Sequence, residues 1–316
     1  MRGKIIIVAS ALVILLLAAL FLAVNYFYGE SVKRGVEVEL YGGDEITQDV
    51  SIEDQVILEE AKQWFNNQDL QIIELTSNDH LTLQANFIEN DSPTGKAVIL
   101  AHGYREQSEN MGDYAKFYYD QGFDILLPDA RGHGESKGEY IGYGWHDRLD
   151  YLKWIELLIK EYEAEQIILH GKSMGASLVL MASGEKLPAE VKGIVADSGY
   201  TSVKEELSYQ LKHLYNLPSF PLLDFTSLMT KIRAGYTFEE ASAIEQVKHN
   251  KRPLLIIHGE DDELVPTEMA QQLFAEAGGN KELWIVPNAA HTKGYTLATS
   301  EYQERLTKFL NDALNE

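Results

Sequence analysis

The pentapeptide 171–175 (Gly-Lys-Ser-Met-Gly) constrains the fold of this chain more than any other stretch, because its two flanks fix what it connects. Residues 166–170 are short, apolar and partly β-branched, which predicts a buried strand. Residues 176–182 predict a buried helix. The two glycines of the pentapeptide remove side chains that would crowd so sharp a strand-to-helix turn. We therefore expect an α/β fold, with Ser173 exposed at the end of a sheet strand.

A second match to the same spacing lies at residues 134–138 (Gly-Glu-Ser-Lys-Gly), centred on Ser136. It sits in a polar, glycine-rich loop, and no apolar helical run begins at its second glycine. The spacing alone is thus a weak signal, and the strand–turn–helix context favours Ser173 as the candidate nucleophile. The helix N-terminus beneath Ser173 favours the negative charge that develops when a serine attacks a carbonyl.

Predicted strands and helices alternate from Lys96 onward, which calls for a mainly parallel sheet with helices on both faces. The strands are expected at residues 97–101, 124–127, 166–170, 193–196, 254–258 and 282–286, and the helices near 111–121, 147–162, 174–186, 268–276 and 300–314. Ahead of them, residues 53–66 have helical spacing, and residues 70–76 and 81–89 are typical of a hairpin.

One connection is longer than the others in this alternation of strands and helices, since about fifty residues separate Asp197 from Pro253. We interpret residues of about 201–250 as a small helical lid over the strand ends, where ligands bind in such sheets. The alternative is a packing excursion with no substrate contact.

The first thirty residues form an appendage to this domain. Residues 5–24 are apolar except for Ser10, which is long enough to cross a bilayer as a helix. Basic residues precede the run, and residues 25–28 (Asn-Tyr-Phe-Tyr) suit an interfacial aromatic belt better than a signal-peptidase site. We favour an uncleaved signal-anchor at residues 1–28 over a cleaved signal peptide.

The expected organisation is a signal-anchor at 1–28, a juxtamembrane stalk at 29–53 and a catalytic domain at 54–316 that includes the lid. The basic N-terminus predicts a single-pass protein of the cell membrane with the domain outside the cell. Lys33 and Arg34, on the far side of the span, dilute that charge asymmetry.

The net charge of −22 argues against nucleic-acid binding. The absence of cysteine excludes disulfides, thiol catalysis and cysteine metal sites. No metal cluster, phosphate loop or dinucleotide fingerprint is recognisable, so we expect no cofactor and no metal. The expected partners are a small-molecule acyl substrate and the membrane, with no obligate protein partner.

A nucleophilic serine needs a base and donors for the oxyanion. Among the nine histidines, His291 follows the last predicted strand on a loop at the C-terminal edge of the sheet, within reach of Ser173. His170 and His258 end strands and are expected to be structural. The loop after the 97–101 strand and the first turn of the helix expected at 174–186 predict an oxyanion hole made of the main-chain N–H groups of Tyr104 and Met174.

The orienting acid has three candidates. Asp261 and Asp262 are adjacent in the loop after the 254–258 strand, and Asp197 ends the preceding strand. All three precede His291 in the chain.

Five segments together resemble the successive signatures of the α/β-hydrolase superfamily. They are residues 101–104 (Ala-His-Gly-Tyr), 128–136 (Pro-Asp-Ala-Arg-Gly-His-Gly-Glu-Ser), 171–175, 258–266 (His-Gly-Glu-Asp-Asp-Glu-Leu-Val-Pro) and 290–291 (Ala-His). The resemblance covers residues of about 70–314. Within the superfamily, the chain is similar to bacterial membrane-anchored cell surface hydrolases of the serine aminopeptidase and esterase-like branch. It implies the α/β-hydrolase fold, a catalytic triad and hydrolysis of an ester, thioester or amide.

The resemblance also favours one acid. The family pattern His-Gly-x-x-Asp-x-x-Val-Pro falls in register only if Asp262 is its aspartate. Successive loop side chains diverge and two carboxylates on one imidazole would repel each other, so Asp261 is expected to be solvated. Asp197 is expected to belong to the strand exit beneath the lid.

The expected function is cleavage of a carboxylic ester by Ser173, His291 and Asp262. Amide or peptide cleavage is the nearest alternative; an aminopeptidase would need a lid carboxylate, for which Asp224, Glu239 and Glu240 are available. A different class of alternative is a non-catalytic, membrane-tethered binding protein on the same scaffold.

Overall fold

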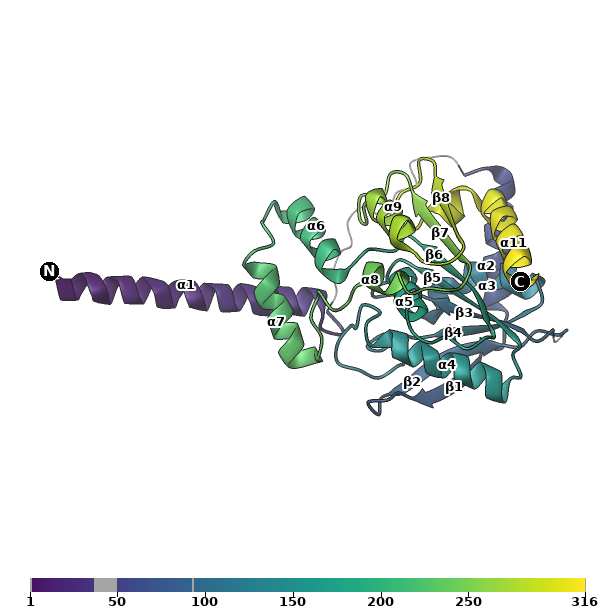
Figure 1. Cartoon of the computed structure of the whole chain (residues 1–316), viewed down its shortest axis with the longest axis horizontal. Helices are drawn as coiled ribbons and strands as arrows, with labels where there is room; N and C mark the ends of the chain where they lie inside the picture. The colour runs from purple at the N-terminus through teal and green to yellow at the C-terminus, as the bar shows by residue number, and fades with distance from the viewer. Residues whose placement is uncertain (1, 37–49, 93, 316) are drawn as a thin grey trace.

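An eight-stranded sheet in the order β1-β2-β4-β3-β5-β6-β7-β8 lies at the centre of the structure (Figure 1). The computed structural model describes residues 2–36, 50–92 and 94–315. The strands are β1 (Gln71–Thr76), β2 (Thr82–Ile88), β3 (Lys96–Ala101), β4 (Phe123–Pro128), β5 (Gln166–Lys172), β6 (Val191–Asp197), β7 (Leu254–Gly259) and β8 (Lys281–Val286). The helices are α1 (Arg2–Ser31), α2 (Ile52–Asn66), the short 3₁₀ helix η1 (Ser108–Met111), α3 (Gly112–Asp120), α4 (Asp147–Glu161), α5 (Met174–Ser183), α6 (Val203–Tyr215), α7 (Leu222–Ala234), α8 (Ala243–Val247), α9 (Thr267–Glu276), α10 (Gly294–Leu297) and α11 (Thr299–Asn315).

The sheet is parallel from β4 through β8, and only β1 and β2 run antiparallel to their neighbours. The central strands β3, β5, β6 and β7 are buried almost throughout, because helices cover both faces of a parallel sheet. Both faces of these strands are buried, which is why their sequences are continuous apolar runs instead of alternating ones. The expectation of a mainly parallel sheet is confirmed.

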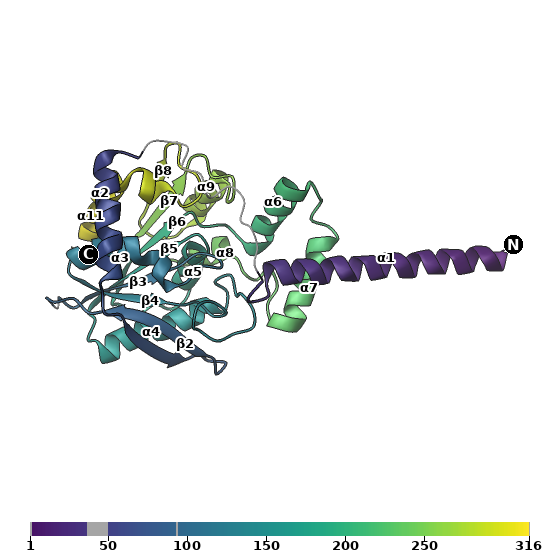
Figure 2. The ribbon, with the colours of Figure 1, turned by 180° about the vertical axis from the view of Figure 1, so that it is seen from behind.

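Two apolar cores hold the helices to the sheet. One core lies under α4, α5, α8 and α9, and the other lies under α2, α3 and α11 on the opposite face (Figures 1 and 2). The fully buried Trp154 of α4 belongs to the first core, and Tyr302 of α11 belongs to the second. The predicted helices and strands are all present, with ends shifted by a few residues.

Some short elements were not expected, namely η1, α8 and α10. α5 also ends at Ser183 instead of the predicted residue 186. A Cβ atom on the next residue, Gly184, would lie 2.7 Å from the backbone oxygen of Gln246 in α8. The helix ends where the backbone of α8 crosses it, a long-range contact that local periodicity cannot reveal.

The segment predicted as a helical lid does form helices. α6, α7 and α8 follow β6 in the chain, and α6 and α7 stand away from the sheet on the side where α1 emerges (Figures 1 and 2). Arg233 links α7 to α1, because its guanidinium donates to Asn25 Oδ1 at 3.0 Å and lies 4.9 Å from the ring centre of Tyr28.

α1 is longer than the expected anchor and packs on the domain. The side chains of Val24, Tyr28 and Val32 are buried against the body of the protein. The prediction of a stalk from residue 29 is therefore wrong for its first part, since the helix continues to Ser31 and residues 32–36 contact the loop around Tyr140. The remainder of the predicted stalk falls largely on residues 37–49, outside the described residues.

The domain supplies the cap of α1. The last carbonyl groups of a helix have no partner within the helix and need donors from elsewhere. The Tyr104 hydroxyl donates to the Glu30 and Ser31 carbonyl oxygens at 3.0 Å each, the Tyr143 hydroxyl donates to Ser31 at 2.7 Å, and Arg105 donates to Glu30 at 2.7 Å. α1 thus ends inside the domain that it carries.

A membrane span fits the length and composition of α1, and among the described helices it alone does so. A signal sequence near an N-terminus would pass the same test.

His170 at the end of β5 predicts how acid affects stability. Its ring lies between the hydroxyls of Tyr118 and Tyr302, at 3.0 Å and 3.3 Å, and burial lowers its pKa to about 3. Since the folded pKa lies below the unfolded value of about 6.5, its contribution is complete above pH 6.5 and disappears as the pH falls toward 3.

His170→Gln should therefore flatten the loss of stability between pH 6.5 and 4 relative to the wild type, although it lowers stability at pH 7. Denaturant unfolding of both full-length proteins in detergent across this pH range measures the effect. Parallel pH profiles would contradict the assignment.

Candidate active site

Ser173 occupies a strained turn between β5 and α5. Its backbone angles are φ 56° and ψ −118°, a region that residues with a side chain rarely adopt. A Cβ atom on Gly171 would lie 2.1 Å from the Gly175 oxygen, and one on Gly175 would lie 2.1 Å from the Ala101 oxygen of β3. Only glycine permits these contacts. The turn therefore holds the Ser173 side chain up at the carboxyl end of the sheet.

A chain of hydrogen bonds joins Ser173, His291 and Asp262. Ser173 Oγ lies 2.8 Å from His291 Nε2, and His291 Nδ1 lies 2.7 Å from Asp262 Oδ2. An ionised carboxylate only accepts hydrogen bonds, so Nδ1 carries the hydrogen and Nε2 is free to accept the serine proton. The three predicted residues lie on three different loops, and the fold brings them together.

Asp262 is held ionised by its surroundings. Its Oδ1 atom accepts the N–H groups of Leu264 and Val265 at 3.0 Å and 2.8 Å, and its Oδ2 atom also lies 3.2 Å from His258 Nε2. Burial alone would raise the pKa of Asp262, but the two imidazoles, His291 and His258, hold it well below its usual range.

The other candidate residues have different positions. Asp261 is exposed. Asp197 is buried, and its carboxylate accepts Tyr302 at 2.9 Å and Ser198 at 2.9 Å instead of His291. Ser136 is fully buried, donates to the Asp129 carbonyl at 2.7 Å and accepts a backbone N–H at 2.8 Å, which is a structural role in a turn.

The loop after β3 fixes the peptide group that carries the Tyr104 N–H. His102 Nε2 accepts the Ala130 N–H at 2.9 Å, so His102 Nδ1 carries the hydrogen and donates to the Gly103 carbonyl at 2.8 Å. Burial lowers the pKa of His102, which keeps this ring neutral. Because C=O and N–H point in opposite directions across a trans peptide, the Tyr104 N–H points away from His102.

The second predicted donor, the Met174 N–H, belongs to the first residue of α5, where a helix has no internal acceptor. Neither this N–H nor that of Tyr104 donates to another group in the described part of the chain. Both residues line the same pocket as Ser173 and His291. The structure therefore leaves two free donors beside the serine.

Glu106 ties the two donor segments together. Its carboxylate accepts the Gly103 N–H at 2.8 Å and pairs with Lys172 at 3.0 Å, the residue before Ser173. The loop after β3 and the turn after β5 are thereby held at a fixed separation. The sequence analysis missed this residue, whose only local signal is its place three residues after Gly103.

Ser173 opens onto a pocket of about 310 Å³ with mostly apolar walls. The lid supplies one side through Leu207, Leu211 and Leu223, and the last turns of α1 supply another through Phe27. The lid helices therefore contact the space next to Ser173, which favours a lid over a packing excursion.

One acidic side chain of the lid lines this pocket, and it is not one of the three expected. Asp224 and Glu239 pair with Lys204, and Glu240 pairs with Lys231. Glu206 of α6 lines the pocket instead.

Glu206 is 8% exposed, and its Oε2 atom has no partner in the described structure. Burial, with a smaller contribution from Asp262, raises the pKa of Glu206 to about 8. The group is therefore mainly a neutral acid at pH 7. Among the described residues, no group of three or more histidine, aspartate and glutamate side chains could hold a metal ion.

Comparisons with known proteins agree with the fold. A family model described as serine aminopeptidase, S33, matches residues 92–223. The uncharacterized protein YqkD of Bacillus subtilis is 31% identical over 220 residues, which cover 69% of this chain and 72% of that protein. The lysophosphatidylserine lipase ABHD12 of Macaca fascicularis is 28% identical over 59% of this chain and 47% of its own length. Among solved structures, the Pyrococcus furiosus esterase Pf2001 covers 86% of this chain and 99% of its own, with a TM-score of 0.64 and 24% identity.

The close contact at Gly175 predicts the cost of a methyl group there. Gly175→Ala should destabilise the protein by about 1–3 kcal/mol, because the new Cβ would collide with the backbone at the end of β3. Gly29→Ala is the matched control, since nothing lies within 4 Å of its Cβ position and alanine favours a helix. Thermal unfolding of both variants in detergent measures the difference. Equal midpoints would contradict the assigned contact.

Proposed function

Because this chain belongs to the α/β-hydrolase superfamily, we propose that it is a serine hydrolase that cleaves carboxylic esters through an acyl-enzyme on Ser173. The hydrogen-bonded series Ser173–His291–Asp262 is the observation that carries this proposal. It supplies nucleophile, base and orienting acid in the arrangement that acyl transfer needs.

The chemistry follows from these positions. Ser173 Oγ attacks the acyl carbon while His291 Nε2 accepts its proton, and the Tyr104 and Met174 N–H groups stabilise the oxyanion. When the intermediate collapses, the bond between carbon and the alcohol oxygen breaks and His291 returns the proton to the leaving alcohol. Water then repeats the sequence on the acyl-enzyme and frees Ser173. Asp262 holds the imidazole in the required tautomer throughout.

The pocket supports an apolar acyl group. Its leucine side chains and Phe27 offer an apolar surface next to Ser173, and no basic cluster there would select a charged acyl chain. The similar ABHD12 of Macaca fascicularis is a lysophosphatidylserine lipase, which is consistent with an acyl ester of an amphiphile.

The proposed location is the cell membrane, with α1 as a single uncleaved span and the catalytic domain outside the cell. Arg2 and Lys4 before the apolar run support this orientation. The packing of α1 against the domain supports retention of the helix in the mature protein.

A fluorophosphonate probe tests the nucleophile. We expect the probe to label the wild type and Ser136→Ala, but not Ser173→Ala, because Ser173 has an imidazole at hydrogen-bond distance and Ser136 bonds backbone groups instead. In-gel fluorescence of the full-length proteins provides the measurement. Labelling that survives in Ser173→Ala and disappears in Ser136→Ala would show that the other serine is the nucleophile.

Asp262→Asn should lower turnover by about four orders of magnitude, since the wrong tautomer of His291 would be favoured. Asp261→Asn is the matched control and should stay within about twofold, because its side chain is solvated. Initial rates on p-nitrophenyl butyrate compare the two. Near-normal turnover in Asp262→Asn would refute the assignment of this acid.

Peptide cleavage at a free N-terminus is the second candidate, and Glu206 is the observation that favours it. A lid carboxylate inside the pocket could pair with a substrate ammonium group. Its raised pKa, however, makes it mainly neutral at pH 7, which suits a hydroxyl or carbonyl better than an ammonium.

We expect Glu206→Gln to keep ester turnover within about threefold, because a glutamine preserves the size and the hydrogen bonds of a neutral acid. Initial rates on p-nitrophenyl esters and on aminoacyl-anilides measure this. A wild type that prefers anilides, together with loss of that preference in Glu206→Gln, would overturn the ester assignment in favour of an aminopeptidase.

A further inference from the structure

The outward face of the lid is unusually apolar. Outside α1, the described residues include nine large hydrophobic side chains that are exposed, and six of them lie in residues 215–232. Those six are Tyr215, Leu217, Phe220, Phe225, Leu228 and Ile232. A patch that is concentrated on one element marks a site of interaction, whereas scattered exposed side chains do not.

α7 exposes large apolar side chains along one face. Phe225, Leu228 and Ile232 follow helical spacing there, and Ile232 is 77% exposed. The buried residues of the same helix include Leu223, but also the polar Thr226. A helix in water ordinarily buries its large apolar side chains, so the exposed face of α7 fits contact with a nonpolar phase.

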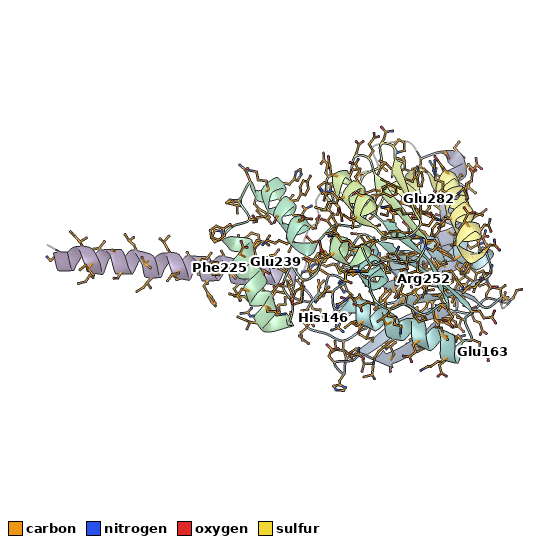
Figure 3. The ribbon with its side chains drawn as sticks, viewed as in Figure 1. His146, Glu163, Phe225, Glu239, Arg252 and Glu282 are labelled. Carbon is orange, nitrogen blue, oxygen red and sulfur yellow. The ribbon has the colours of Figure 1, made fainter. Side chains whose placement is uncertain are left out.

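The position of α7 identifies this phase. Arg233 contacts Asn25 and Tyr28, the residues directly after the apolar run of α1. If that run spans about 30 Å of hydrocarbon, Asn25 lies at the membrane surface, and α7 lies at the same depth. Figure 3 shows Phe225 on this side of the molecule, beside α1, and Glu163 and Glu282 at the opposite end.

The local charge agrees with contact to lipid. The whole chain has a net charge of −22, which opposes the approach of a phospholipid surface. Residues 203–235 carry four lysines and arginines against three aspartates and glutamates. The segment of α6 and α7 therefore lacks the strong negative charge of the whole chain and is repelled less by such a surface.

The pocket beside Ser173 has walls from both α1 and the lid. Phe27, Glu30 and Ser31 of α1 and Leu222 and Thr226 of the lid are among its walls. We infer that the exposed face of α7 and the loop before it, which we call the lid surface (residues 215–232), dock into the interfacial layer of the membrane that α1 spans. The pocket between α1 and the lid then takes the acyl chain of a membrane lipid directly from that layer. The docking stands on its own, and the lipid substrate rests on the proposed function.

The absence of natural cysteine allows the docking to be measured without reference to catalysis. Phe225→Cys and Ile232→Cys in the full-length chain are labelled with a nitrobenzoxadiazole fluorophore and reconstituted into phosphatidylcholine vesicles that contain doxyl-labelled lipid. Glu163→Cys and Glu282→Cys are the controls. We expect blue-shifted, lipid-quenched emission at residues 225 and 232 and aqueous emission at the two controls.

Two results would overturn the docking. Aqueous emission at residues 225 and 232 would show that the lid surface faces water. Blue-shifted emission that doxyl lipid does not quench would show that protein covers the surface, either a second copy or another partner.

The lipid substrate is tested with the combined variant Phe225→Ser, Leu228→Ser and Ile232→Ser. We expect at least a tenfold loss in hydrolysis of a long-chain monoacyl phospholipid held in vesicles, and a change within twofold on soluble p-nitrophenyl butyrate. Ile52→Ser with Val56→Ser is the control, since it removes exposed apolar side chains from α2, away from the lid.

Equal losses on both substrates, or no loss on the vesicle lipid, would refute delivery from the membrane. A wild type that is inactive on both substrates but shows quenched labels at residues 225 and 232 would retain the docking and refute the proposed hydrolase function.

Discussion

The contact between the backbone of α5 and the end of β3 is the constraint on which the site depends. Gly175 rests against the Ala101 carbonyl, and the Ser173 N–H donates to the Asp197 carbonyl at 2.8 Å, so the turn is fixed to both neighbouring strands. This double attachment maintains the strained backbone of Ser173. It also places the N–H groups of two separate segments beside one side chain. A less crowded junction would relax the turn, and the serine would lose its alignment with His291.

The sequence was sufficient for the sheet, most helix positions and the placement of Ser173 and His291, because each has a local cause. Buried parallel strands are continuous apolar runs, and the loop positions of Ser173 and His291 follow from where those strands end. The choice of Asp262 among three acids rests on the family resemblance instead. The helix ends and short connecting helices were not predictable, since they depend on contacts between distant segments. The extent of α1 was missed for the same reason: residues 29–36 look polar and irregular, yet they pack on the loop around Tyr140.

Glu206 and His258 show a second limit of sequence reasoning. Neither stands in a pattern that distinguishes it from other acids or from a structural histidine. In the fold, His258 lies 3.2 Å from Asp262, whose carboxylate raises the pKa of His258 despite its burial. The pKa of Glu206 is raised only because α6 folds over the pocket and buries its carboxyl group. The properties of these groups come from their surroundings, so the lid determines the chemical character of the pocket as much as its shape.

The cap at the end of α1 joins this helix to the loop beside Ser173. Tyr104 and Arg105 belong to the loop beside Ser173, and the same side chains hold the final carbonyls of the helix. The loop and the helix therefore stabilise each other, and removal of either one destabilises the conformation of the other. A protease that cut the helix and shed the domain would release a protein with a loosened loop and an incomplete pocket wall. Removal of the helix would then disturb the site as well as detach the domain.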